Sequence, residues 1–309
     1  MLGPLLLAAS GSDRIRRFVS GAPMTRPVVD RFIAGDALPD ALATVRALAA
    51  RGIDVTLDHL GEDITEVSQA HRSRDAYLAL LDALGAEGLG DRAEVSVKLS
   101  AFGQSLPGGR RLALEGARAV CAKAAEIGTT VTLDMEDHTT VDSTLAILAE
   151  LRRDFPRTGV AVQAALFRTE QDVRALASSG SRVRLVKGAY KEPASVAHQR
   201  RQDVDRAYAR CLNTLMAGEG YPMVGSHDPR VIDLALKLAE RYGRAPDSYE
   251  FQMLYGIRDG EQRRLAAEEG RRVRAYIPYG SDWYGYFMRR LAERPANLAF
   301  FLRSLLTRA

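Results

Sequence analysis

Residues 130–137 read TVTLDMED, and this octapeptide begins a structural unit that recurs along the chain. The apolar, β-branched run Thr130–Asp134 predicts a strand, and the polar residues after it predict a turn. An amphipathic stretch over Ser143–Arg153, with apolar residues three and four positions apart, then predicts a helix. The unit is therefore a strand, a turn and a helix.

The same unit occurs eight times. The runs expected to form strands are Asp54–Leu57, Glu94–Leu99, Thr130–Asp134, Val160–Ala164, Val183–Lys187, Met223–Gly225, Tyr249–Met253 and Val273–Ile277. Helices are predicted between them over segments that include Leu112–Glu126, Gln171–Ala177, Gln202–Met216, Pro229–Tyr242 and Glu261–Glu268. Strands that are apolar on both faces and joined by helices form parallel sheets covered on all sides. Eight units predict a closed (β/α)8 barrel of the α/β class, with a doubly wound open sheet as the alternative.

The N-terminal segment lies outside the repeat. Its apolar pattern, which includes Arg14–Val19 and Ala41–Ala50, predicts helices packed on the barrel wall. We therefore expect a helical arm over residues 1–46 and one barrel domain over residues 47–309, which includes a helix near the C-terminus.

Composition limits the classes of function. Of 309 residues 46% are apolar, and 43 Lys and Arg against 39 Asp and Glu leave a formal charge of +4. Most arginine doublets alternate with acidic residues, which is typical of a solvated helix surface and does not indicate nucleic-acid binding. Cys121 and Cys211 lack metal-ligand spacing and are expected to be reduced core residues. Because the apolar stretch Leu5–Ala9 is too short to cross a membrane, we expect a cytoplasmic enzyme.

The carboxyl ends of barrel strands carry the chemistry of this fold, and here those ends are polar. They bring Asp58, Glu62, Lys98, Asp134, Gln163, Arg184, Lys187, Ser226, His227, Gln252 and Tyr276. Burying such groups unpaired is costly, so we expect them to pair with each other or with a ligand. Single residues also have structural interpretations. Asp134 can cap a helix or pair with Lys98. Lys98 and Lys187 can be interior ion-pair partners, and His227 can be a turn residue at the start of a helix.

Familiar catalytic motifs are missing from the sequence. It contains no H-E-x-x-H, no G-x-S-x-G and no G-x-x-x-x-G-K-[ST], the signatures of zincins, α/β-hydrolases and P-loop proteins. Residues 88–93, GLGDRA, match G-x-G-x-x-A, but they precede a strand, whereas the dinucleotide fingerprint follows one.

Two segments have the composition of ligand sites. Residues 184–190, RLVKGAY, put two cations before a glycine, which suits a phosphate or an electron-rich ring such as a flavin. Near the C-terminus, Tyr286, Arg289, Arg290 and Glu293 share one helix face because they are three, four and seven residues apart. The two guanidinium groups can clamp a carboxylate, with Glu293 orienting them. A surface salt bridge between Arg289 and Glu293 is the alternative.

The sequence resembles the proline dehydrogenase family. The segments that match it, in the same order, are Val95–Leu99, Leu133–Glu136, Arg184–Tyr190, Ala275–Gly280 and the pattern from Tyr286 to Asn297. The resemblance implies a distorted (β/α)8 barrel that binds FAD and oxidises L-proline to Δ1-pyrroline-5-carboxylate, with electrons passed to a quinone. This reaction is the first step of proline catabolism to glutamate.

The resemblance also implies roles for single residues. Lys98, Arg289 and Arg290 would hold the proline carboxylate, Tyr276 and Tyr286 would enclose its ring, and Asp134 and Arg184 match catalytic positions. The residues that match the FAD lining are Met135, Gln163, Val186, Lys187, Gly188, Ala189, Tyr190, Ser226 and His227. Glu62 would pair with Arg289 to close the pocket. His59 and Ser226 depart from the residues common in the family, and neither departure removes a charge.

Partners follow from the same resemblance. The extensions of bifunctional relatives are absent, so a separate pyrroline-5-carboxylate dehydrogenase would take the product. The quinone would be a membrane quinone, met by peripheral contact at the inner membrane face. The residues alone leave two other functions open: a Schiff-base aldolase with Lys98 or Lys187 as nucleophile, and a non-catalytic binding protein.

Overall fold

The computed structural model describes residues 26–61, 64–178 and 180–293. Eight parallel strands close into a barrel in sequence order, which confirms the (β/α)8 barrel and excludes the open sheet. The strands are β1 (Asp54–His59), β2 (Ala93–Val97), β3 (Val131–Leu133), β4 (Gly159–Gln163), β5 (Arg182–Val186), β6 (Tyr221–Gly225), β7 (Glu250–Leu254) and β8 (Val273–Tyr279). The barrel closes where β1 pairs with β8, from Asp54 opposite Arg274 to His59 opposite Tyr279.

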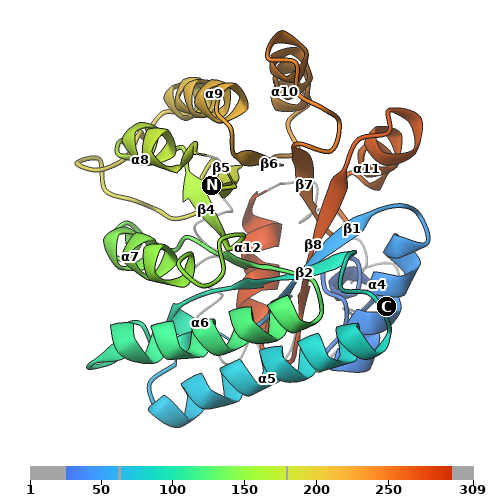
Figure 1. The fold of residues 1–309 in the computed structure, drawn as a ribbon, viewed down its shortest axis with the longest axis vertical. Helices are drawn as coiled ribbons and strands as arrows, with labels where there is room; N and C mark the ends of the chain where they lie inside the picture. The colour runs from blue at the N-terminus through green and yellow to red at the C-terminus, as the bar shows by residue number, and fades with distance from the viewer. Residues whose placement is uncertain (1–25, 62–63, 179, 294–309) are drawn as a thin grey trace, which may run out of the picture.

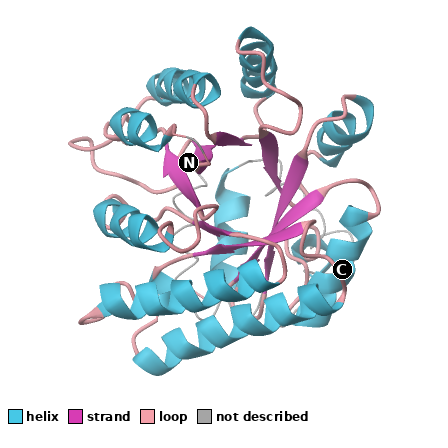
Figure 2. Ribbon diagram, in the orientation of Figure 1, coloured by secondary structure: helices cyan, strands magenta, loops and turns pink. Residues whose placement is uncertain are grey.

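Helices surround the strands, as Figures 1 and 2 show. They are α4 (Leu38–Ala49), α5 (Val67–Ala86), α6 (Gly109–Glu126), α7 (Val141–Leu151), α8 (Thr169–Leu176), α9 (Arg201–Ala217), α10 (Pro229–Arg241) and α11 (Asp259–Arg263). The helix expected over Glu261–Glu268 is not one continuous α-helix, because α11 passes into a π-helical turn at Arg264–Glu268. The long helix α5 lies outside the segments predicted above.

The two faces of the strands differ, and this corrects the expectation that both are apolar. Outward residues such as Val55, Leu57 and Val95 pack with the helices in one large apolar core. Inward residues, which alternate with them, include the buried polar side chains of Thr56 and Glu94. The strands are covered on both faces, as predicted, but the inside of the barrel is polar.

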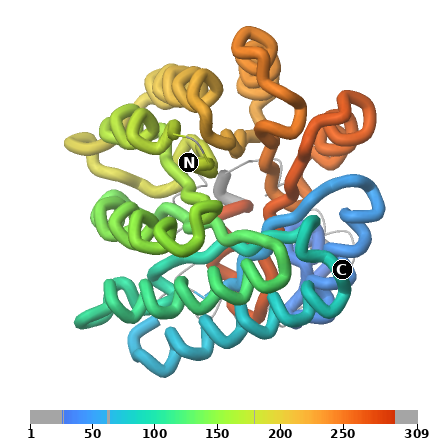
Figure 3. Tube along the Cα trace, viewed as in Figure 1, coloured from blue at the N-terminus to red at the C-terminus, as the bar shows by residue number. Residues whose placement is uncertain are grey.

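A second apolar cluster holds α12 (Trp283–Glu293), the helix that the sequence predicted near the C-terminus. Trp283 and Phe287 of α12 pack with Phe32, near the short helix α3 (Arg26–Val29), and with Leu60 and Ile257. Leu60 directly follows β1, and Ile257 follows β7. The helix therefore lies at the carboxyl ends of these strands, and in Figures 1 and 3 it projects inside the ring of outer helices.

The expected N-terminal arm falls partly within the described residues. The predicted helix at Ala41–Ala50 corresponds to α4, whereas Arg14–Val19 lies outside the described residues. The expected boundary at residue 46 falls inside α4, and the division into arm and barrel stays a prediction. Cys121 and Cys211 are buried and unbridged. None of the helices in the described ranges is long and apolar enough to span a membrane.

Candidate active site

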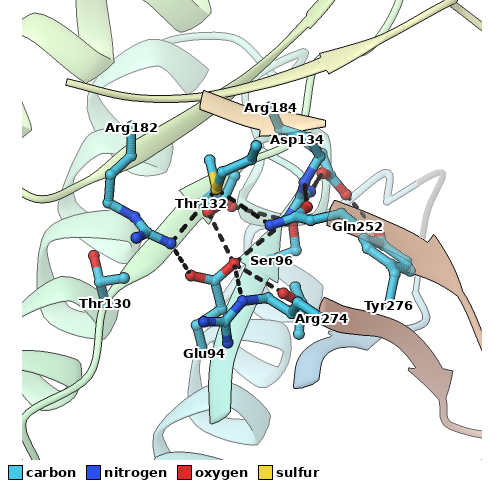
Figure 4. Close-up of polar contacts among 12 residues, drawn as sticks. Glu94, Ser96, Thr130, Thr132, Asp134, Arg182, Arg184, Gln252, Arg274 and Tyr276 are labelled. Carbon is cyan, nitrogen blue, oxygen red and sulfur yellow. Dashed lines mark hydrogen bonds and ion pairs between the residues drawn. The ribbon is translucent and has the colours of Figure 1, made fainter. Parts of the chain in front are cut away.

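Asp134 is the junction of a polar network at the carboxyl ends of β2, β3, β5 and β8 (Figure 4). Its Oδ1 accepts hydrogen bonds from Arg184 Nη1 at 2.6 Å and from Ser96 Oγ at 2.8 Å. Its Oδ2 accepts from Tyr276 OH at 2.7 Å and lies 3.6 Å from Lys98 Nζ. The structure thus brings four of the predicted site residues, Lys98, Asp134, Arg184 and Tyr276, into one network.

The charges around Asp134 keep it ionised. Burial by itself would raise the pKa of this carboxyl group, but the positive charges of Arg184 and Lys98 and the bond from Tyr276 outweigh burial. The pKa of Asp134 is therefore lowered. Burial and the charge of Asp134 raise the pKa of Tyr276 well above its ordinary value, so its hydroxyl stays a donor. Asp134 lies 3.6 Å from Lys98, as one of its structural interpretations predicted, but it does not cap the following helix α7, whose N-cap residue is Thr140.

Lys98 lies between two carboxylates. Its Nζ donates to Asp58 Oδ2 at 2.6 Å, and it lies 3.6 Å from Asp134. Asp58 is on β1 and Asp134 follows β3, the two strands that pair with β2. Asp58 is buried and also lies 3.4 Å from Tyr77 OH, which donates a shorter bond to the backbone of Ser96. Lys98 is therefore an interior ion-pair partner, as one interpretation predicted, and it stands next to Tyr276 OH at 3.5 Å.

Arg184 crosses the barrel interior from β5. Its Nε donates to Gln252 on β7, and its Nη1 donates to Ser96 Oγ at 2.8 Å as well as to Asp134. The guanidinium carbon lies 5.3 Å from the centre of the Tyr276 ring, in cation–π geometry. Arg184 is only 4% exposed, so its orientation is determined by these contacts.

Below this network lies a layer of buried charges that sequence reasoning missed. Glu94 accepts from Arg182 at 2.7 Å, and Glu250 accepts from Arg274 at 2.9 Å. Arg274 Nε also lies 3.8 Å from Glu94, which links the two pairs. One signal could have revealed this layer: polar or charged residues at every second position of otherwise apolar strands, as in Glu94-Val95-Ser96-Val97-Lys98.

The residues expected to line FAD lie at the carboxyl ends of four neighbouring strands, β3, β4, β5 and β6. Gln163 is buried and donates from Nε2 to the backbone carbonyl of Glu136 at 2.7 Å. Gly188 has φ +110°, and a Cβ there would lie 3.2 Å from Gln163 Oε1. Gly188, Ala189 and Tyr190 are exposed, whereas Val186 beside them is half-buried. Met135, which follows Asp134, is buried on the neighbouring side.

Lys187 forms ion pairs with residues near the carboxyl end of β6. Lys187 Nζ lies 3.1 Å from Asp228 Oδ2 and also binds Asp205, so the ion-pair interpretation of this lysine is correct. Asp228 caps α10 by accepting from the backbone N–H of Arg230, and hydrogen bonds from Arg230 and Lys187 lower its pKa. Ser226 Oγ accepts from the Asp228 backbone N–H at 3.1 Å. Because this bond uses a lone pair, the Ser226 hydroxyl hydrogen can still be donated to a ligand.

His227 precedes the capped start of α10, as the turn interpretation predicted. Its Nε2 accepts from the backbone N–H of Leu254 at 2.8 Å, which puts the proton of the neutral ring on Nδ1. Its carbonyl oxygen accepts from Arg258. The bond to Leu254 joins the loop after β6 to the end of β7.

The predicted carboxylate clamp lies on α12. Arg289 and Arg290 are half-buried, and the Arg290 guanidinium lies 5.1 Å from the centre of the buried Tyr286 ring. These residues reach the mouth of the barrel through the packing of α12 on Leu60 and Ile257. Glu62 lies outside the described residues, as does the side chain of Glu293, so their ion pairs stay predictions.

Comparisons with known proteins agree with this arrangement. The profile of the family described as proline dehydrogenase matches residues 41–303. A proline dehydrogenase of Deinococcus radiodurans is 42% identical over 282 residues, or 90% of each chain. Proline dehydrogenase 1 of Bacillus subtilis is 36% identical over 306 residues, or 99% of each chain.

A solved structure supports the fold. The proline utilization A protein of Bdellovibrio bacteriovorus, inactivated by N-propargylglycine, matches with a TM-score of 0.81 at 24% identity. The match covers 87% of this chain and 33% of that one. Because the family profile spans most of the chain and curated relatives align with it over nearly their full length, the chain belongs to the proline dehydrogenase family.

Proposed function

We propose that the protein oxidises L-proline to Δ1-pyrroline-5-carboxylate, with FAD as the bound hydride acceptor and a quinone as the final electron acceptor. The observation that carries this proposal is the network of Lys98, Asp134, Arg184 and Tyr276 at the mouth on which α12 is packed. The family of the chain supports the substrate.

The ends of β4, β5 and β6 fit a flavin nucleotide. An exposed backbone segment at Gly188–Tyr190 lies beside the buried Gln163, and the positive φ of Gly188 and the tight 3.2 Å contact that a Cβ there would make with Gln163 disfavour a side chain at this position. Ser226 offers a hydroxyl donor next to it. When bound, FAD supplies the ring that accepts hydride. The residues that would hold it are Met135, Gln163, Val186, Lys187, Gly188, Ala189, Tyr190, Ser226 and His227.

The substrate would be anchored by its carboxylate. Lys98, Arg289 and Arg290 would bind it, and each charge-assisted hydrogen bond contributes roughly 1.5 to 3 kcal/mol. Tyr276 and Tyr286 would enclose the apolar ring of the substrate. Since hydride loss occurs at the ring carbon next to nitrogen, holding this carbon in one position is the main task of the protein.

The charges of the site also suit the protonation state that the reaction needs. Hydride loss forms a C=N bond and therefore requires a neutral amine with a free lone pair. The positive charges of Lys98 and the two arginines favour release of the ammonium proton to solvent. Asp134 already accepts bonds from Arg184, Ser96 and Tyr276, so it orients these groups and is not the base.

The network disfavours the aldolase. A Schiff-base lysine must present an unprotonated amine to a carbonyl compound. Lys98 and Lys187 are instead ion-paired with aspartates at 2.6 Å and 3.1 Å. We further propose that the quinone is a membrane quinone reached by peripheral contact, that the protein is otherwise cytoplasmic, and that a separate pyrroline-5-carboxylate dehydrogenase consumes the product.

The visible spectrum of the purified protein tests the proposal. We expect a flavin absorption band that bleaches when L-proline is added without air. In Arg184→Ala, bleaching should slow by about 100-fold or more, since removal of one preorganised charge at a reacting centre costs that much. A colourless protein that cannot be reconstituted with FAD, or a yellow one that proline does not bleach, would overturn the proposal. Borohydride trapping of a lysine adduct would favour the aldolase.

A further inference from the structure

Gln252 contacts Arg184 inside the barrel and belongs to neither the carboxylate clamp nor the FAD lining proposed above. It is buried on β7 and points into the barrel (Figure 4). Its Oε1 accepts from Arg184 Nε. Its Nε2 donates to Glu250 Oε1 and lies 3.2 Å from Met223 Sδ. The carboxamide therefore connects the lower layer of charges to the network around Asp134.

The chemistry of its neighbours permits one orientation of this amide. Arg184 can only donate hydrogen bonds, and an ionised Glu250 can only accept them. If the amide were rotated by half a turn, its NH2 group would face the guanidinium and its oxygen would face the carboxylate. Both contacts would then be repulsive, so the pair of neighbours determines the orientation of Gln252.

Glu250 is ionised because of its own partners. Burial by itself would raise the pKa of Glu250, but the charges of Arg274 and Arg182 outweigh it and lower the pKa to about 2. Arg274 donates to both oxygens of Glu250, at 2.9 and 3.3 Å. The carboxylate behind Gln252 is thus held in place as firmly as the amide itself.

We propose that Gln252 is a positioning residue for the reaction: its amide, oriented by Glu250, holds the Arg184 guanidinium at the angle at which it acts on the bound flavin. The inference rests on the proposed function of Arg184. Arg184 also contacts Ser96, Asp134 and the ring of Tyr276, and its Nη2 lies 3.6 Å from Glu94. These contacts are made at the outer end of the guanidinium, whereas Gln252 binds the Nε at its base. Without an acceptor at Nε the group can rotate about its long side chain.

The test compares Gln252→Met with Gln262→Met in the FAD-loaded enzyme. Methionine has a similar volume but offers no comparable acceptor to Arg184. Gln262 is a matched control, since it is equally buried and near β7 but donates to the backbone carbonyls of Leu254 and Ile257. We expect Gln252→Met to slow anaerobic flavin reduction by about 10-fold to 100-fold with little change in the KM for proline.

Two further readouts separate positioning from a structural role. In Gln252→Met the midpoint potential of the flavin should fall, because a misplaced guanidinium stabilises the reduced ring less. The affinity of the apoprotein for FAD should stay within about threefold of wild type, because the expected FAD-lining residues lie on other strands. Gln262→Met should match wild type in both potential and reduction rate.

Gln252→Asn keeps the test decisive if the methionine variant does not fold. The asparagine amide keeps a donor and an acceptor in the polar interior, but it is one methylene shorter and withdraws the acceptor from Arg184 Nε, so the flavin potential should again fall. A wild-type potential and reduction rate in either folded variant overturns this inference and leaves the proposed function intact. A wild-type enzyme that proline does not reduce overturns the proposed function itself.

Discussion

Charged side chains are held differently inside the barrel and on helix α12. Inside the barrel, arginines and glutamates are at most 6% exposed and are held by each other. On α12, the half-buried Arg289 and Arg290 project from a helix that is held by apolar packing around Phe287. From this difference we expect that removing one charge mainly damages the fold in the first region and mainly weakens ligand binding in the second.

The interior should respond most strongly to loss of Glu94. This carboxylate lies 2.7 Å from Arg182 and 3.6 Å from Arg184. Glu94→Leu leaves buried guanidinium groups without their partner, so we expect the free energy of unfolding to fall by about 3 to 5 kcal/mol in urea titrations. Glu126→Leu is the control, because Glu126 pairs with Lys123 at the surface and should change stability by less than about 0.5 kcal/mol. Equal effects of the two substitutions would contradict the comparison.

The pH dependence of stability provides a second test of the comparison between the barrel interior and α12. Because the pKa of Glu250 is lowered from 4.5 to about 2, its ionised form stabilises the fold above pH 4.5, and this contribution is lost as pH falls towards about 2. The difference in unfolding free energy between wild type and Glu250→Gln should therefore shrink by about 3 kcal/mol over that interval. The control is Glu170→Gln, whose exposed partner is Arg210. A constant difference across this range would show that folding does not lower the pKa of Glu250.

The position of α12 should depend on the apolar packing around Phe287. Phe287 is fully buried, and its ring centre lies 6.4 Å from that of Phe32 and 5.8 Å from that of Trp283. Phe287→Leu leaves a small cavity, so we expect a loss of about 1 to 2 kcal/mol in unfolding free energy. The KM for proline should rise as well, because the arginines move with the helix. An unchanged KM together with the loss of stability would separate the helix from substrate binding.

The smallest effect is expected where an arginine of α12 is removed without disturbing its packing. Arg290→Met should raise the KM for proline about tenfold, equivalent to about 1.4 kcal/mol, while FAD stays bound and the free energy of unfolding falls by no more than about 1 kcal/mol, the size of its cation–π contact with Tyr286. Arg289→Met should behave in the same way. Arg206→Met, at an exposed position on α9, serves as the control. If both α12 variants retain the wild-type KM, the carboxylate clamp is wrong.

Much of the fold was predictable from the sequence, because strand and helix periods are local properties. Each strand bound lies within two residues of the predicted run, as for Asp54–Leu57 against Asp54–His59. The polar strand ends at Lys98, Asp134 and Arg184 could also be predicted from the sequence. The lower layer at Glu94 and Arg274 escaped notice because single charges in short apolar runs look like strand boundaries.

The amino-acid sequence alone determined the number of repeating units, the polar strand ends and the family to which the chain belongs, since these depend on local sequence patterns. Only the tertiary structure decided which polar and charged side chains contact each other. Arg184 meets Asp134 fifty residues before it and Gln252 sixty-eight residues after it, and Lys98 meets Tyr276 across 178 residues. Such partners are chosen by the curvature and register of a closed sheet, which only the folded barrel has.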